Sequence, residues 1–392
     1  MFWLYLLLIV ILLIAVLLNG LAVWRARCFI KKQAADEKYG MQKPPVTLMV
    51  PICGTEGDDL EHFSRFCRLD WPNYQVIFTV LDPADPVIPI LQQIPSSARC
   101  EVKLHIGGSA KGNNLKIRNL LNAMPWVRND LIVICDADVK PEPHFLEGLI
   151  APLMNPFLQH SQNSKEDSKI GLVHSLYRCM ADHNNMPTAW ESVWINCDFW
   201  VHGLLGDWLR GTNYAFGAAI AIHRATLNQI GGLEAFADYL ADDYQIGQRV
   251  WRLKKTIVFN QHFVTLRTKS QTWSETWKHL LRWSRTIRVC QPSGYAGSIL
   301  LNVTFFAILG LLINFHYFLP WSLLALFLRA MMANQCHNWI LDKHGFWGRW
   351  WLVFFKDLAQ VVLWLLAFHN GTVEWRGVRH RLHSDGKLSP TP

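Results

Sequence analysis

The first 23 residues of the chain contain no charged side chain, and Asn19 is their only strongly polar one. An uncharged stretch of this length meets the requirement of about 20 apolar residues for a helix that spans a membrane. The alternative is a cleaved signal peptide, for which Gly20–Ala22 offers a weak cleavage site. No charge precedes the apolar run and basic residues follow it at once, which favours a retained membrane anchor over residues 1–24.

Cysteine pairs are also missing, because the nine cysteines include no C-x-x-C pair and no spacing typical of a disulfide framework. This pattern favours a reducing compartment with free, mostly buried thiols. The basic residues after the anchor agree, since the positive-inside rule places the segment that follows them on the cytoplasmic side. These residues are Arg25, Arg27, Lys31, Lys32, Lys38 and Lys43.

No helix suited to reading nucleic acid is recognisable, although the net charge is +8. The basic residues gather near apolar segments, so attraction to anionic lipid headgroups explains them more simply. Hydrophobic residues make up 51% of the chain, and 19 residues are Trp. This content exceeds what one ordinary soluble core requires, so we expect part of the chain to lie in lipid, with membrane lipids and not nucleic acid as partners.

Three apolar segments near the end of the chain are candidates for membrane helices, namely Ser298–Ile313, Phe318–Met332 and Trp350–Phe368. The first two are short. Three full crossings after a cytoplasmic domain would leave Arg376, Arg379 and Arg381 outside, against the positive-inside tendency. Either one segment is re-entrant or the rule fails here. The last segment contains Lys356-Asp357, which is costly in a spanning helix, so we expect it to be incomplete or interfacial.

Short β-branched runs alternate with helical or loop segments between residues 44 and 270. This alternation predicts an α/β domain with a mainly parallel sheet that is covered on both faces. Pro51 is expected to stop the first strand, and Asn155–Lys169 is typical of an exposed loop or insertion. The strand candidates are Val46–Val50, Val76–Leu81, Val102–Ile106, Leu131–Cys135, Ile170–Leu176 and Ala218–Ile222.

Two acidic residues, Asp136 and Asp138, directly follow the buried strand predicted at Leu131–Cys135. Because residues i and i+2 of a strand point to the same side, these carboxylates emerge together at the strand's carboxyl end, where α/β sheets bind ligands. Hard oxygen donors in this position suit Mg²⁺ or Mn²⁺ holding a diphosphate. The motif therefore suggests a metal-dependent sugar transferase that works at a membrane surface.

Three other polar groups are candidates for chemistry, and each has a plain structural alternative. Asp82 follows the second predicted strand and either accepts hydrogen bonds from a nucleoside or forms a turn beside Pro83. Lys111–Lys116 offers cations and small amides before a helix, which suits a phosphate or a solvated loop. Asp242-Asp243 pairs two carboxylates, whose repulsion would raise a pKa and suit proton abstraction from an alcohol, or it caps a helix.

Two Trp-rich stretches have helical periodicity. In residues 190–208 the apolar residues form one stripe, which either lies in the membrane interface or packs on the sheet. In the second stretch, Trp273, Trp277, Leu280 and Ile287 share one face, and Arg282 lies opposite Trp273. A helix lying in the interface would bury its Trp face there and present guanidinium groups toward a cytoplasmic site.

As a set and in chain order, these residues resemble the family 2-type inverting glycosyltransferases, and most closely the ceramide glucosyltransferase branch, family 21. The resemblance covers roughly residues 44–295 and rests on Pro51, Asp82, Asp136-Ala137-Asp138, Gly231-Gly232, Ala241-Asp242-Asp243-Tyr244 and Arg282-Trp283. Within the branch, Phe216–Ala218, Ala237–Tyr244 and Arg282–Arg288 are more similar to bacterial hopanoid-associated N-acetylglucosaminyltransferases.

The resemblance implies a GT-A (Rossmann-like) fold, a UDP-sugar donor, Mg²⁺ or Mn²⁺, and inversion at the anomeric carbon. By matching positions, the uridine would be bound by Asp82, the diphosphate by Asp136 and Asp138 through the cation, and the pyrophosphate also by Arg282. Asp243 aligns with the catalytic base, and Asp242 is its neighbour. The further donor candidates are Lys111, Lys116 and His174, and the acceptor candidates are Trp283 and His279.

One position departs from the family pattern. The motif Gln/Arg-x-x-Arg-Trp begins here with His279, so the part that this position plays in contacting diphosphate or acceptor is open. The expected organisation is an anchor at residues 1–24, a cytoplasmic catalytic domain at 44–270, an amphipathic interface helix at 271–295, membrane helices at 296–370 and a basic tail at 371–392.

The sequence therefore predicts a multi-pass enzyme, in a bacterial inner membrane, that transfers one N-acetylglucosamine from UDP to a hopanoid. Transfer of glucose to ceramide is the alternative. A processive polysaccharide synthase is disfavoured because it needs a translocation channel, and the chain offers at most four membrane segments. For a non-enzymatic receptor or scaffold, the ordered acidic residues would be a coincidence.

Overall fold

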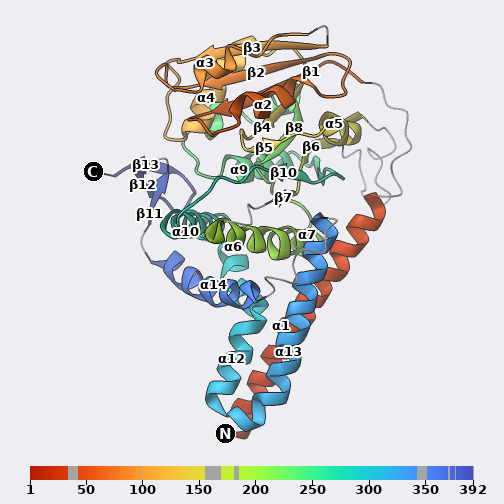
Figure 1. The fold of residues 1–392 in the computed structure, drawn as a ribbon, viewed down its shortest axis with the longest axis vertical. Coiled ribbons are helices and arrows are strands. Elements are labelled where there is room, and N and C mark those ends of the chain that lie inside the picture. The colour runs from red at the N-terminus through yellow and green to blue at the C-terminus, as the bar shows by residue number, and fades with distance from the viewer. Residues whose placement is uncertain are drawn as a thin grey trace.

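The computed structural model describes residues 1–33, 43–97, 99–154, 169–180, 185–341, 351–369, 371–375 and 377–391. An α/β domain lies at one end of the molecule and an apolar bundle, here called the stem, at the other (Figure 1). Helices that lie across the long axis, here called the platform, separate the two (Figure 1). Residues 34–42 of the expected linker and 155–168 of the expected loop lie outside the described residues.

The domain is built on a seven-stranded sheet in the order β3-β2-β1-β4-β8-β6-β9. Only β8 runs antiparallel to its neighbours, and every other pair in this sheet is parallel. The strands are β1 (Val46–Ile52), β2 (Tyr74–Val80), β3 (Cys100–Ile106), β4 (Leu131–Cys135), β6 (Ile170–His174), β8 (Ala219–His223) and β9 (Thr256–Phe259). All six predicted strands are present, and β9 was missed.

Both faces of this sheet are buried, as the uninterrupted apolar runs require. In β4, Leu131, Val133 and Cys135 pack into the core on one face, where α2, α3 and α5 lie. Ile132 and Ile134 pack on the other face against α4, α8 and α9. These helices are α2 (Asp59–Ser64), α3 (Ile88–Leu91), α4 (Leu115–Ala123), α5 (Phe145–Met154), α8 (Arg224–Gln229) and α9 (Asp242–Arg252). The prediction of a mainly parallel α/β sheet covered on both faces is confirmed.

The prediction that Pro51 stops the first strand is wrong. β1 continues to Ile52, and Pro51 pairs with Thr79 of β2. Pairing with β4 ends at Met49, so beyond that residue β1 has a partner on one side only, and the missing N–H is tolerated. A second, three-stranded sheet was also missed, and it consists of β5 (Val139–Lys140), β7 (Tyr177–Cys179) and β10 (Val264–Leu266).

The stem contains the two described helices that are long and apolar enough to cross a membrane. They are α1 (Phe2–Gln33) and α13 (Phe315–Leu341). The anchor helix is thus longer than the predicted residues 1–24, and the predicted segment Phe318–Met332 is part of a helix of 27 residues. All nine cysteines are free, which agrees with the expected absence of disulfides.

The third stem helix, α12 (Val303–Ile313), forms a hairpin with α13. Before it, α11 (Pro292–Gly297) and the 3₁₀ turn η5 (Ser298–Leu301) are bent by 56° relative to α12. The hairpin turns at Asn314, whose side chain donates to the Tyr5 hydroxyl at 3.0 Å, beside the start of α1 (Figure 1). α12 therefore runs away from the platform, and α13 returns toward it (Figure 1).

The platform is formed by helices from both Trp-rich stretches and by the last helix. Its elements are α6 (Met186–Trp194), the π-helical turn η3 (Ile195–Phe199), α7 (Trp200–Arg210), α10 (Trp273–Cys290) and α14 (Leu352–Phe368). The stripe of the first stretch is interrupted by η3 and is largely buried, with Trp190 and Leu204 5% and 2% exposed, but Trp208 at its end is 45% exposed. It packs mainly on stem and platform helices, and its cluster also includes Phe259 of β9. On α10, Trp273 and Ile287 are exposed, whereas Leu280 is buried.

The predicted basic tail folds into a third sheet of β11 (Thr372–Trp375), β12 (Val378–Leu382) and β13 (Leu388–Pro390). This sheet docks on the segment that leads into α9: the Leu388 N–H donates to Asp238 at 2.7 Å, and the Leu240 N–H donates to Gly386 at 3.1 Å. The C-terminal sheet therefore packs against the α/β domain. α12 and α13 form a hairpin, and α14 lies across the platform (Figure 1).

Candidate active site

The loop after β4 places Asp136 and Asp138 at the carboxyl end of the large sheet. Three contacts hold its backbone: the Asp136 N–H donates to Ala218 at 2.9 Å, the Asp138 carbonyl accepts from the Arg267 N–H at 2.6 Å, and His62 Nε2 lies 2.7 Å from the Ala137 oxygen. The two carboxylates are thus fixed by neighbouring segments, which are β8, the chain after β10, and α2.

Lys116, in the first turn of α4, lies between two of the acidic residues. Its ammonium group is 2.6 Å from Asp136 Oδ1 and 3.6 Å from Asp242 Oδ2. Burial alone would lower the pKa of Lys116, but the charges of Asp136 and Asp242 outweigh burial and raise that pKa. Lys116 is therefore a permanent cation at the site. Lys111 has an exposed side chain at the domain surface.

Asn114 connects Lys116 to the start of α9. Its side chain caps α4 by accepting from the Ile117 N–H at 3.0 Å. The same amide donates to the Tyr239 carbonyl at 2.7 Å and to Asp242 Oδ1 at 3.2 Å. The beginnings of α4 and α9 are thereby held together, so the predicted phosphate-binding segment and the predicted base lie at one site.

Asp242 and Asp243 begin α9, and Asp243 points toward Gly217. A Cβ atom on Gly217 would lie 2.9 Å from Asp243 Oδ2, so only glycine leaves room for this carboxylate. Burial and the charge of Asp242 raise the pKa of Asp243 to about 7. A carboxylate with a pKa near neutrality is well matched to accepting a proton from an alcohol and releasing it again.

Asp136 and Asp138 are the residues that could hold a divalent cation. Desolvation and the charge of Asp136 raise the pKa of Asp138 to about 7, although its side chain keeps access to solvent. This shift indicates negative charge that the protein leaves partly uncompensated. Among the described residues no three His, Cys, Asp or Glu side chains form a complete metal site. Two carboxylates suit a cation whose other ligands are phosphate oxygens and water.

Four aromatic rings, here called the aromatic floor, lie between the carboxylates and the platform. Phe199 of η3 has its ring centroid 4.7 Å from Tyr177, 4.6 Å from Phe216 and 5.8 Å from Trp283. Burial raises the pKa of Tyr177, and the nearby charges of Asp243 and Asp138 raise it further. The aromatic floor, which includes Trp283 of α10, therefore lies within the electric field of the acidic residues.

His279, the residue that departs from the family motif, is held by Glu191 of α6. Its Nδ1 atom lies 2.5 Å from Glu191 Oε1, and Gln271 donates to the other oxygen of Glu191 at 3.0 Å. The ring centroid of His279 is 4.8 Å from that of Trp283. Glu191 thus fixes the ring beside the aromatic floor.

The remaining predicted donor residues occupy different settings. Asp82 is exposed at the end of β2, and its Oδ1 accepts from the Ala84 N–H at 2.9 Å in a turn. Arg282 is partly buried on α10 next to Trp283. His174 has no exposed surface, its Nδ1 accepts from the Phe216 N–H at 2.9 Å, and burial lowers its pKa to about 3. This setting favours support of Phe216 over direct contact with a donor.

Sequence reasoning missed Tyr177 and Glu191 as parts of the site, and it named Asn114 and Gly217 only within the longer segments Lys111–Lys116 and Phe216–Ala218. Asn114 carries a usable local signal, because Asn directly before a helix is a common cap. Glu191 carries none, since its partner His279 lies 88 residues away along the chain. Gly217 and Tyr177 gain meaning only once the fold places Asp243 beside them.

Acidic side chains lie at the carboxyl edge of a mixed α/β sheet with a partly buried lysine between them, an arrangement that suits a sugar diphosphate. The sequence model of Glycosyl transferase family 21 matches residues 7–388, and the chain belongs to this family. It is therefore a nucleotide-sugar glycosyltransferase. No further specificity follows from family membership itself.

Two relatives from Caenorhabditis elegans match most of the chain. Ceramide glucosyltransferase 1 is 20% identical over 367 residues, which cover 88% of this chain and 73% of the relative. Ceramide glucosyltransferase 3 is 20% identical over 369 residues, which cover 88% and 74%. These similarities agree with the family 21 branch that the sequence resembles.

A solved structure that resembles the chain is the mannosyltransferase PcManGT from Pyrobaculum calidifontis in complex with GDP-Man and Mn²⁺. It is 14% identical, with a TM-score of 0.44, and the match covers 90% of this chain and 99% of the other. A likeness at this level transfers neither the nucleotide nor the metal to this protein.

We predict that Gly217→Ala reduces turnover by about 10- to 100-fold, because small displacements of a reacting group have effects of this size. Gly217 does not have a positive φ, so the backbone accepts alanine and the change acts through Asp243. Gly57→Ala is the matched control, since an added Cβ there meets nothing within 4 Å. Transfer rates and thermal unfolding of both variants provide the measurement. Normal turnover in Gly217→Ala would contradict the placement of Asp243 at the reacting centre.

Proposed function

We propose that the protein transfers one sugar from a UDP-sugar to the hydroxyl group of a membrane lipid, with glucose and ceramide as the pair that the relatives favour. The observation that carries this proposal is the joining of Asp136, Lys116 and Asp242 in one contact network above the aromatic floor. We infer from this network a diphosphate-binding edge and a base beside the platform helices. The proposed setting is a membrane crossed by α1 and α13.

The donor side of the site combines negative and positive groups. Asp136 and Asp138 would hold a divalent cation, which neutralises charge on the departing UDP. Lys116 stabilises the same charge from the protein side, because the charges of Asp136 and Asp242 outweigh burial and keep it protonated. We assign Arg282 to the pyrophosphate and Asp82 to the uridine, as the sequence predicts.

The acceptor side is built around Asp243. The lipid hydroxyl oxygen attacks the anomeric carbon from the face opposite UDP, while the bond from that carbon to the UDP oxygen breaks and UDP leaves with the electron pair. The hydroxyl proton passes to the Asp243 carboxylate, whose pKa of about 7 suits this transfer. Trp283 and His279, fixed by the aromatic floor and by Glu191, border the place where the lipid end would lie.

Product analysis tests the proposed reaction. Full-length protein in lipid vesicles is supplied with radiolabelled UDP-glucose or UDP-N-acetylglucosamine, together with ceramide or bacteriohopanetetrol. The expected product is one sugar on ceramide. Transfer to the hopanoid alone would identify the hopanoid as the acceptor, and a polymer would indicate a polysaccharide synthase. No transfer to any lipid would contradict the proposal.

Metal dependence gives a second test. We predict that exhaustive chelation abolishes transfer and that Mg²⁺ or Mn²⁺ restores it, because charge stabilisation by a cation contributes several kcal/mol to such reactions. Asp138→Ala should lower turnover by at least about 100-fold for the same reason. Asp130→Ala is the control, since this carboxylate is 92% exposed and pairs only loosely with Arg224 at 3.9 Å. Full activity after chelation would refute the metal assignment.

The base assignment makes a separate prediction. Asp243→Asn keeps the shape of the side chain but removes the proton acceptor, so the chemical step should slow by roughly 10²- to 10⁴-fold. UDP-sugar affinity should survive. Asp242→Asn should have the smaller effect, because Asp242 acts on its neighbour's charge and on Lys116. Transfer rate and donor affinity are measured in both variants. Near-normal turnover in Asp243→Asn with a collapse in Asp242→Asn would move the role of base to Asp242.

A further inference from the structure

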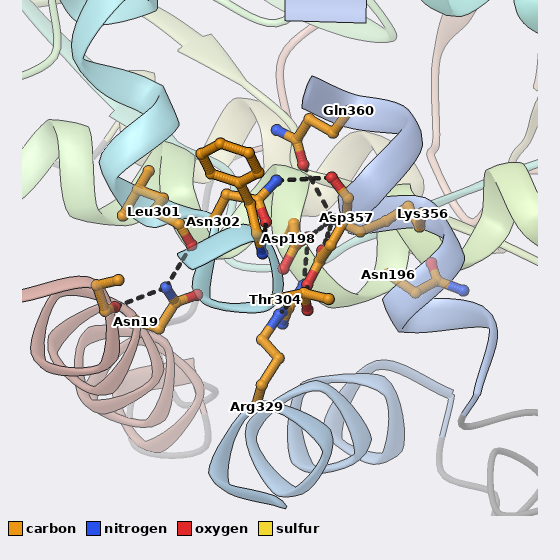
Figure 2. A network of polar contacts seen from close by, with 12 residues as sticks. Asn19, Asn196, Asp198, Leu301, Asn302, Thr304, Arg329, Lys356, Asp357 and Gln360 are labelled. Atoms are coloured by element: carbon orange, nitrogen blue, oxygen red, sulfur yellow. Dashed lines mark hydrogen bonds and ion pairs between the residues drawn. The ribbon is translucent and has the colours of Figure 1, made fainter. Parts of the chain in front are cut away.

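Four charged side chains are buried together where the stem meets the platform (Figure 2). Arg329 of α13 lies 2.8 Å from Asp198 of η3 and 2.9 Å from Asp357 of α14. Lys356 of α14 contacts Asp198 and lies 2.7 Å from Asp357. Each of the four side chains is 1–4% exposed. Two acids and two bases leave this set, here called the charge cluster, electrically neutral.

Polar side chains from other helices complete the charge cluster (Figure 2). The Thr304 hydroxyl donates to Asp357 Oδ2 at 2.6 Å, and Lys356 donates to Gln360 at 3.1 Å. Asn302 donates to the Asp357 carbonyl at 2.7 Å, and Asn19 of α1 donates to Leu301 at 2.8 Å. The charge cluster and its neighbours therefore connect all three stem helices with α14 and η3.

A buried ion pair is weak support for stability, because desolvation offsets most of the attraction between the charges. We interpret these buried charges as fixing how the helices pack, because the helices must meet in a placement that pairs every charge. Here that arrangement includes η3, the only π-helical turn among the described elements. π-Helical turns inside α-helices are frequent at functional sites.

The turn η3 also contacts the active site. Phe199 follows Asp198 directly and contacts the other three rings of the aromatic floor, including Tyr177 and Trp283, which also contact each other. Asn196 of the same turn accepts from the Cys179 N–H at 2.9 Å and donates to the Cys179 carbonyl at 2.8 Å, which fixes β7 with Tyr177. One short turn thus connects the stem on one side with the acceptor side of the site on the other.

We propose that Asp198 is a positioning residue for sugar transfer: the charge cluster holds η3 against the stem, and η3 holds Phe199 beneath Tyr177 and Trp283. The inference rests on the proposed lipid acceptor. The donor residues Asp136 and Lys116 lie on the loop after β4 and on α4, where contacts from β8, α2 and α9 hold them. We therefore expect a disturbed charge cluster to change use of the acceptor more than binding at Asp136 and Lys116.

The test compares full-length variants in lipid vesicles, with KM for ceramide, turnover and UDP affinity measured separately. Asp198→Asn retains size and leaves a buried positive charge unbalanced. It should raise the acceptor KM or lower turnover by about 10- to 100-fold, the range expected when a contact surface shifts by about 1 Å. UDP affinity should stay within about twofold, because the donor residues stay in place. Asp198→Asn combined with Lys356→Met restores neutrality and should recover part of the loss.

Phe199→Leu separates positioning from folding, since it leaves every charge in place and removes only the ring. It should reproduce the acceptor defect, and Phe199→Tyr should rescue it. The control is Asp207→Asn on α7, which removes another contact between platform and stem, the partly exposed pair with Arg25 at 3.9 Å. This control should behave as wild type.

Three outcomes would overturn the inference: normal acceptor kinetics in folded Asp198→Asn, normal kinetics in Phe199→Leu, or an equal loss of UDP and acceptor binding in both variants. If Asp198→Asn does not fold, Phe199→Leu alone decides. Failure of the wild-type protein to transfer sugar to any lipid would instead refute the proposed function, so the two failures are distinguishable.

Discussion

Repulsion among carboxylates is the constraint around which the catalytic domain is arranged. Asp136, Asp138, Asp242 and Asp243 lie at one edge of the sheet, and a fold that gathers them must offset their charge. Lys116 does so for Asp136 and Asp242, and the Asn114 amide adds a hydrogen bond to Asp242. Desolvation, followed by the charges of Asp136 and Asp242, raises the pKa values of Asp138 and Asp243 to about 7. The uncompensated carboxylates are the ones suited to a cation and to a proton.

In the charge cluster, too, each buried charge is offset by an opposite one. Arg329 and Lys356 are buried where the stem meets the platform, and they are matched by Asp198 and Asp357 and by neutral donors and acceptors. The matching fixes how α13, α14 and η3 meet. Because η3 continues into the aromatic floor, the packing of apolar helices and the geometry of the acceptor site are connected through one π-helical turn.

The elements that sequence predicted well are those set by local pattern. The run Leu131–Cys135 is apolar on both faces, and the structure has a strand with these bounds, followed by the acidic pair. α13 was predicted too short because Asn334 and Gln335 end the apolar run, yet the helix continues to Leu341 as Ala333, Cys336 and Ile340 pack against neighbouring helices. Packing, which local composition does not encode, decided the length.

Other parts depend on contacts between distant residues. The strands of the C-terminal sheet are short, and they dock on Asp238 and Leu240 and on a small apolar cluster that includes Val373 and Leu388. The break in the first Trp-rich stripe at η3 depends on Asp198 meeting helices more than a hundred residues further on, with a separation of 131 residues to Arg329. Periodicity within the stretch gives no sign of it.

The central claim is that the edge after β4 binds a nucleotide diphosphate through a cation. The most direct measurement is an experimental structure of the full-length protein in lipid nanodiscs with UDP and Mn²⁺. The account predicts the cation within coordination distance of Asp136 and Asp138, with the diphosphate beside Lys116. A cation and diphosphate bound elsewhere, for example at the acidic residues Glu56, Asp58 and Asp59 that surround Arg267, would contradict it.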